Sequence, residues 1–140
     1  MKKCILFLIV SFLLLFSLSV SASCNLDTTR WKWVASDSKK GVFYDAQTLK
    51  ILNQRRNFVE CWLCIYCPIG CSSFDGEHYH YYLNRIDYSS NTWGKKGVLV
   101  RNAEGNIIQN INLYDYFYEP IAPDTIMEHI ALKIKTDYGL

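Results

Sequence analysis

Apolar and polar residues alternate in two runs near the middle of the chain, from Phe58 to Cys67 and from Glu77 to Leu83. In the first run every odd position is apolar, whereas the even positions mix charged and aromatic side chains. A period of two predicts a β-strand with one face toward a core. The segment 68–76 between the runs is rich in Pro, Gly and Ser, so it predicts a tight connection and an antiparallel strand pair.

Shorter runs on both sides of this pair extend the predicted sheet. Trp31–Val34 and Val42–Asp45 flank a turn-forming segment and predict a hairpin, after which Asp45 is placed to cap a short helical turn. A strand that opens at Trp93 and is clearest at Val98–Val100, and a second at Ile107–Leu113, flank a loop that contains Gly and predict a second hairpin. These segments make about six strands, and their short links favour antiparallel pairing.

One helix is predicted, from Asp124 to about Thr136. Pro120 and Pro123 keep the preceding segment extended, and Thr125 with Glu128 has the form of a capping box. An apolar stripe at helical spacing comprises Ile126, Met127, Ile130, Ala131 and Ile134. The predicted fold class is therefore α+β, an antiparallel sheet of about six strands with one C-terminal helix packed on it, after a cleaved signal peptide.

The N-terminal residues 1–23 have the three parts of a signal peptide. Lys2 and Lys3 precede an apolar run, and small residues around Ala22 suit cleavage. We therefore expect a single exported domain, residues 24–140, that is secreted, periplasmic or on the cell surface. Cys24 leaves two alternatives open, plain secretion or lipidation of Cys24, and the only expected membrane attachment is the signal peptide or that lipid.

Charge and motif content narrow the function classes. Without Lys2 and Lys3 the basic count falls from 15 to 13, which equals the 13 acidic residues, so nucleic acid is not an expected partner. Aromatic residues make up 15 % of the chain, which suits both a small sheet domain and a binding surface. The sequence has no phosphate-binding loop, no serine nucleophile motif and no evident acid–base carboxylate pair. We predict a protein that is not an enzyme and has no cofactor.

Four cysteines, Cys61, Cys64, Cys67 and Cys71, have the spacing of a four-iron ferredoxin motif. The motif lacks its proline, no second run exists, and a strand would turn Cys64 away from Cys61 and Cys67. We expect disulfides instead, as is usual in exported domains. Cys67 and Cys71 are the first candidate pair, and Cys61 and Cys64 are further candidates. The alternative is a thiol, disulfide or metal-binding protein that uses Cys61–Cys71.

His78 and His80 share one face of a predicted strand at a spacing that can hold a metal ion. A third ligand would be Asp75 or Glu77, if the loop folds back. Two surface histidines without a metal are the commoner case, so no metal site is predicted. The candidate surface for a partner comprises Trp62, Tyr66, His78, His80 and Tyr82.

The order of several short motifs resembles a known family. Trp31-Lys32-Trp33-Val34 leads to Val42–Ala46, Cys61-Trp62-Leu63 follows, and Tyr118–Thr125 precedes the helix. From Trp31 to the C-terminus the chain resembles the surface-adhesin protein E-like domain of small exported bacterial proteins. The resemblance implies an antiparallel sheet with a packed helix and, for the family's named member, binding of host matrix and plasma proteins.

From this resemblance we expect a non-enzymatic, adhesin-like module that binds host or envelope proteins. The cysteine run departs from the family pattern, and no binding residue is carried over.

Overall fold

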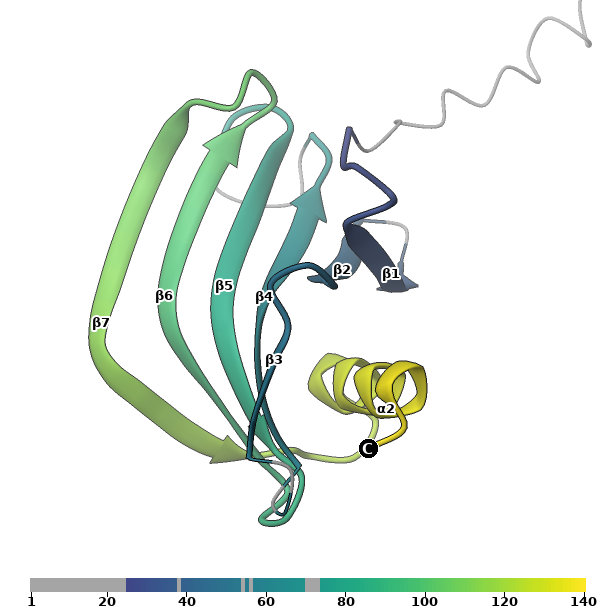
Figure 1. Ribbon diagram of the computed structural model, residues 1–140. Coiled ribbons are helices and arrows are strands. Elements are labelled where there is room, and N and C mark those ends of the chain that lie inside the picture. Colours follow the sequence, from purple (N-terminus) through teal and green to yellow (C-terminus); the bar gives the residue numbers. More distant parts are fainter. Residues whose placement is uncertain (1–24, 38, 54, 56, 70–73) are drawn as a thin grey trace, which may run out of the picture.

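The computed structural model describes residues 25–37, 39–53, 55, 57–69 and 74–140 (Figure 1). The predicted signal peptide, residues 1–23, and the candidate lipidation site Cys24 lie outside this range. The elements are, in chain order, β1 (Trp31–Ser36), β2 (Gly41–Asp45), β3 (Lys50–Asn53), β4 (Phe58–Cys67), β5 (His78–Asp87), β6 (Thr92–Asn102), β7 (Ile107–Pro120) and α2 (Ile126–Tyr138).

All strand pairs of the sheet are antiparallel, and the strand order is β1-β2-β4-β5-β6-β7 with β3 paired to β4. The α+β class and the C-terminal helix are therefore confirmed, but the sheet has seven strands rather than about six. The additional strand is β3, which pairs with the first half of β4 while β2 pairs with the second half. All four residues of β3 are exposed, so its sequence has no buried, alternating face to predict it.

Strands β4 and β5 pair without a break, from Phe58 opposite Asp87 to Cys67 opposite His78. Because side chains alternate, each strand divides between two faces of the sheet. We call the face that carries Leu63 and Ile86 the helix-side face, since α2 packs on it. We call the other face, which carries Trp62, the pocket-side face. Each face has its own buried cluster, so the sheet separates two cores.

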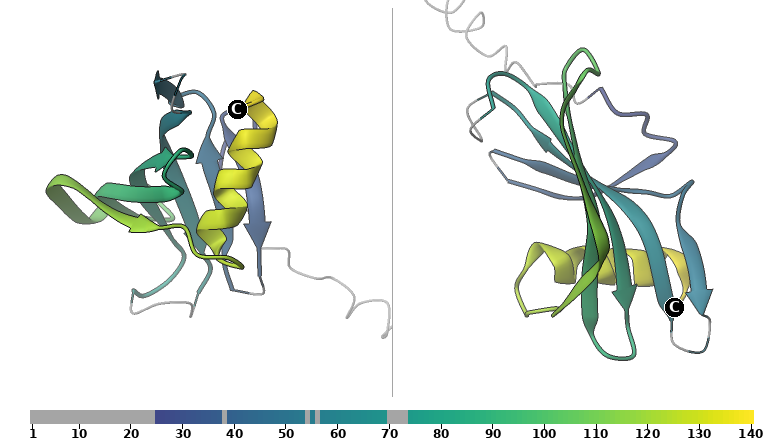
Figure 2. Two further views of the ribbon diagram at one scale, coloured as in Figure 1. Left: turned by 90° about the horizontal axis from the view of Figure 1, so that it is seen from below. Right: turned by 90° about the vertical axis from the view of Figure 1, so that its left-hand side faces the viewer.

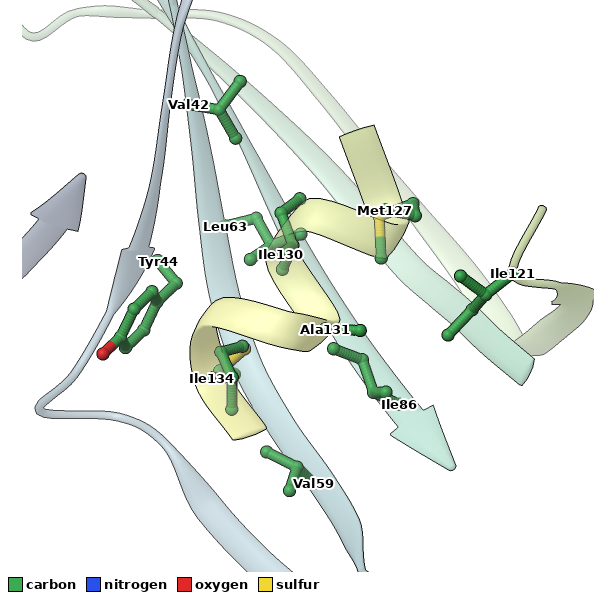
Figure 3. Packing of buried hydrophobic residues seen from close by; sticks show 11 residues of the cluster. Val42, Tyr44, Val59, Leu63, Ile86, Ile121, Met127, Ile130, Ala131 and Ile134 are labelled. Atoms are coloured by element: carbon green, nitrogen blue, oxygen red, sulfur yellow. The ribbon is translucent and has the colours of Figure 1, made fainter. Parts of the chain in front are cut away.

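Helix α2 lies across one face of the sheet (Figure 2) and supplies much of the larger core. Figure 3 shows Ile130 and Ile134 turned toward Leu63, Val59 and Ile86 of the sheet. The helix begins where expected for the capping box, because Thr125 Oγ1 accepts a hydrogen bond from the Glu128 amide. It ends at Gly139, whose φ of 65° is the left-handed conformation that favours glycine at this position.

Two polar connections involve neighbouring residues of β2, one to α2 and one to the segment before β1. The Tyr44 hydroxyl on β2 donates to Asp137 at the end of α2, with 2.6 Å between the oxygens. Asp45 is fully buried, and its Oδ2 accepts from Arg30 at 2.9 and 2.6 Å. Its Oδ1 accepts from the amides of Gln47 and Thr48, so the predicted cap is confirmed, although it closes a turn rather than a helix.

Burial by itself would raise the pKa of Asp45. The hydrogen bonds to its carboxylate and the positive charge of Arg30 outweigh that effect, so the pKa is lower than in a free aspartate. Asp45 is therefore charged at neutral pH although it is buried.

Among the described residues, no helix is long and apolar enough to cross a membrane.

Candidate metal site

Three potential metal ligands meet where β4 ends and β5 begins. Cys67 is the last residue of β4 and lies directly opposite His78, the first residue of β5. His80 follows two residues later, so it projects from the same, helix-side face. One ligand atom from each side chain, the sulfur and two ring nitrogens, lies within 4.8 Å of the other two.

This cluster lies within the protein rather than on an open edge. His78 is fully buried, Cys67 is nearly so, and His80 is half-buried. The ring of Phe74 packs against both imidazoles, with centroid distances of 5.4 Å to His78 and 5.8 Å to His80. The two imidazole centroids are themselves 5.0 Å apart. A bound ion would therefore be largely shielded from water, which strengthens its attraction to a thiolate.

The contacts of each histidine favour the form that binds metals. Nδ1 of His78 lies 2.9 Å from the carbonyl oxygen of Gly76, which can accept only if Nδ1 carries the proton. That tautomer leaves Nε2 with the lone pair that a metal needs, and a backbone acceptor behind a ligating imidazole is common in metal sites. Burial, and then the nearby His78 and Lys40, lower the pKa of His80, which keeps its ring neutral.

The donor set indicates which metals would fit. One sulfur and two imidazole nitrogens suit Zn²⁺ and copper, whereas Mg²⁺ and Ca²⁺ require oxygen ligands. Around a tetrahedral zinc ion, donors bonded at about 2.0–2.3 Å are separated by roughly 3.3–3.8 Å. The present donors lie within 4.8 Å of one another, so inward shifts of less than about 1 Å each would bring their spacing into the range for zinc.

The spacing of the two histidines indicated this site, but the third donor differs from the prediction. The predicted third ligand was Asp75 or Glu77, whereas the residue that joins the histidines is Cys67. Glu77 instead accepts a hydrogen bond from the Tyr79 hydroxyl at 2.8 Å. The sequence contains a signal for Cys67, since it closes one strand of the predicted pair and His78 lies at the start of the other. Only the exact strand register turns that proximity into a shared face.

The remaining cysteines have separate environments. Cys61 packs in the helix-side core and Cys64 in the pocket-side core, which confirms that neighbouring members of the run face opposite ways. Cys61 and Cys64 face opposite ways and are not bonded to each other, and a disulfide of either one with another cysteine stays a prediction. Burial, and then the charges of Asp45 and Glu60, raise the pKa of the Cys61 thiol to about 12. Cys71 lies outside the described residues, so the Cys67–Cys71 bridge stays a prediction.

The five residues predicted to form one partner-binding surface do not lie together. Trp62 and Tyr66 are on the pocket-side face, whereas His78, His80 and Tyr82 are on the helix-side face. Tyr66 and His78 are also buried. The prediction of a single surface is therefore wrong, because the observed register places the two residues of β4 on one face of the sheet and the three residues of β5 on the other.

No protein-family model, no curated protein and no solved structure matches this chain. The resemblance to surface-adhesin protein E-like domains therefore stays a prediction, and the functional argument depends on the geometry of the chain itself.

Proposed function

We propose that this chain is a non-enzymatic metal-binding protein that holds one Zn²⁺ ion through Cys67, His78 and His80. The observation that carries the proposal is that one thiol sulfur and two imidazole nitrogens lie within 4.8 Å of one another, on side chains that are buried or half-buried. This departs from the sequence-based prediction of no metal and develops its alternative, a metal role for the Cys61–Cys71 segment. The two histidines and the cysteine come from paired strands, so the fold supplies the site without a large rearrangement.

Several features support binding in preference to catalysis. The cluster contains no carboxylate that could serve as a general base, and its described donors are buried or half-buried. The ring of Phe74 packs against both imidazoles and would obstruct a substrate that approached them. Such a site suits an ion that is stored, delivered or used to hold β4 and β5 together.

The direct test is a metal titration of the mature protein, exported, purified, stripped with a chelator and reduced. We expect one Zn²⁺ per chain, and Co²⁺ in its place should give a thiolate-to-cobalt charge-transfer band. Cys67→Ser and His78→Ala should each weaken binding by about 100-fold or more, since loss of even an outer-shell partner costs about 10–100-fold. Cys67→Ser should also remove the charge-transfer band.

Matched controls are present in the same chain. His129→Ala removes an exposed histidine on α2, and Cys64→Ala removes a cysteine of β4 that faces away from the site. Neither should change the affinity for Zn²⁺. A wild-type chain that binds no zinc when reduced, or binds it equally after Cys67→Ser, would contradict the proposal.

The expected Cys67–Cys71 disulfide is the principal competitor, because a bridged sulfur cannot ligate zinc as a thiolate. Alkylation in urea without reduction, followed by peptide mass, separates the two states, because urea exposes buried thiols. Cys67 that reacts in urea once zinc has been removed supports the metal site. Cys67 that resists alkylation in urea without zinc, until a reductant is added, supports the bridge.

A protein-binding, adhesin-like role remains a second proposal, and one observation favours it. The edge strand β7 exposes five apolar side chains, which are Ile107, Ile108, Ile111, Phe117 and Tyr118. Exposed apolar residues on an unpaired sheet edge are typical of partner-binding surfaces. Saturable binding to immobilised host matrix or plasma proteins that Phe117→Ser abolishes would support this role. Leu132→Ser, an exposed position on α2, is the control, and absence of saturable binding would count against the role.

A further inference from the structure

The pocket-side face of the sheet carries a pocket with a volume of about 460 Å³. Pockets that hold small molecules usually have volumes of roughly 300–1,000 Å³. Its lining includes four aromatic side chains from β1, β4 and β5, which are Trp31, Trp62, Tyr79 and Tyr81. The rings of Trp31 and Tyr81 are 5.5 Å apart between centroids, and Tyr79 stacks on Tyr81 at 6.5 Å. These rings offer aromatic contact to a flat molecule.

Among the described residues that line the pocket, the charged ones are two arginines, Arg30 and Arg101, and none is Asp or Glu. The charge of Arg30 is already balanced, because its guanidinium donates to Asp45 at 2.6 Å. Arg101 differs. Its Nη1 donates to the carbonyl oxygen of Gly105 at 3.1 Å, and no ion pair joins it to a carboxylate within the described part of the chain.

The bond from Arg101 to Gly105 holds the guanidinium beside the turn between β6 and β7, where Asn102 and Ala103 also line the pocket. A guanidinium has five N–H donors, so one carbonyl leaves most of them available to a ligand. Planar anions such as carboxylates and sulfonates match its geometry. The pocket therefore combines aromatic side chains with one guanidinium that has donors available to a ligand.

We propose that this pocket binds a small ligand with a flat apolar body and one anionic group, the body against Trp62 and Tyr81 and the anion on Arg101. The site lies on the opposite face of the sheet from Cys67 and the histidines, so it does not depend on the proposed metal. It would add the recognition of an organic anion to the functions of this domain.

Two fluorescent probes of nearly the same shape test the charge requirement. 8-Anilinonaphthalene-1-sulfonate carries an anion, whereas N-phenyl-1-naphthylamine is its uncharged counterpart. We expect the sulfonate to bind at one saturable site per chain, about tenfold or more tightly than the neutral probe, as for a hydrogen bond to a charged group. Equal affinities, or sulfonate binding without saturation, would overturn the proposal.

Variants place the binding on the structure. Arg101→Gln should lower the affinity for the sulfonate to that for the neutral probe and leave neutral binding unchanged. Arg55→Gln, the matched loss of an exposed arginine in the β3–β4 connection, should change neither. Trp62→Leu should weaken both probes. Circular dichroism checks that each variant folds. Arg101 is only partly buried, so we expect Arg101→Gln to fold, and this variant tests the proposal even if Trp62→Leu unfolds. Unchanged sulfonate affinity in Arg101→Gln would refute the assignment.

Discussion

Replacing Asp45 by Asn tests the polar arrangement that joins β2 to the segment before β1. The carboxylate is fully buried and accepts two hydrogen bonds from Arg30, at 2.9 and 2.6 Å, and two from backbone amides. Asn keeps one oxygen for the amides of Gln47 and Thr48, but it presents an NH₂ donor to the Arg30 donors. The variant therefore loses the interaction with Arg30 and keeps the cap.

The size of the loss follows from the exposure of the two partners. Stranding a buried charge costs about 3–5 kcal/mol, but the Arg30 side chain is 41 % exposed and can turn toward water. What remains is the loss of hydrogen bonds between charged groups, about 1.5–3 kcal/mol. We expect Asp45→Asn to lower the free energy of unfolding by about 2 kcal/mol. Asp45→Ala should cost about 1 kcal/mol more, because it also removes the cap.

The same carboxylate predicts a dependence on pH. Its folded-state pKa lies below the unfolded value of about 3.9, so the unfolded chain binds the proton more readily. Its contribution is thus complete above that unfolded pKa and is lost as the pH falls through the folded pKa. The destabilisation caused by Asp45→Asn should therefore be large at pH 7 and shrink in the acid range below about pH 4.

Urea unfolding, followed by tryptophan fluorescence at several pH values, measures both effects, with an unchanged m-value as the test of a simple transition. Asp37→Asn is the control, because Asp37 also accepts from two backbone amides but is exposed. It should change stability far less. Ordinary surface substitutions change stability by less than about 0.5 kcal/mol. A change this small for Asp45→Asn at pH 7 would contradict the stabilising role of the Asp45 carboxylate. An equal loss of stability at pH 7 and pH 3 would contradict it as well.

Three further predictions address the cores. Tyr44→Phe should lower the free energy of unfolding by about 1–2 kcal/mol, since it removes the 2.6 Å bond to Asp137; urea titration showing no loss would contradict that role. Ile134→Ala should cost about 2–5 kcal/mol in the same assay, because Ile134 is fully buried between α2 and the sheet, and a loss below about 1 kcal/mol would mean that α2 is not firmly packed. Cys61 should resist thiol reagents in the native protein and react in urea, because it is buried and burial raises its pKa to about 12. Rapid labelling of Cys61 in the native protein, identified by peptide mass, would contradict this and show that the helix-side core opens.

The alternation of side chains predicted much of this fold because burial follows it closely. In β4, positions Val59, Cys61 and Leu63 are buried against α2, as their period of two requires. The helix was equally readable, although Ile126 of its expected stripe is 40 % exposed and Met127 begins the buried face. Strand β3 was missed because neither of its faces is buried. Strand β5 was predicted to end at Leu83, but it continues to Asp87 through the buried polar residue Asn84.

The candidate metal site depended on information that local sequence does not contain. The spacing of His78 and His80 places them on one face, and this was predictable. The participation of Cys67 depends on the register between β4 and β5, and a shift of one residue would turn its sulfur to the other face. The pocket could not be predicted either, because its lining joins residues as distant in the chain as Trp31 and Arg101.

X-ray absorption at the zinc edge is the sharpest test of the proposed metal site, since it reports the atoms bound to the ion in the purified, reduced protein. We expect a first shell of sulfur at about 2.3 Å together with imidazole nitrogens at about 2.0–2.1 Å. We also expect that Cys67→Ser removes sulfur from that shell while Cys64→Ala leaves it unchanged. A shell of oxygen and nitrogen alone, or a sulfur signal that survives Cys67→Ser undiminished, would contradict the assignment of this site.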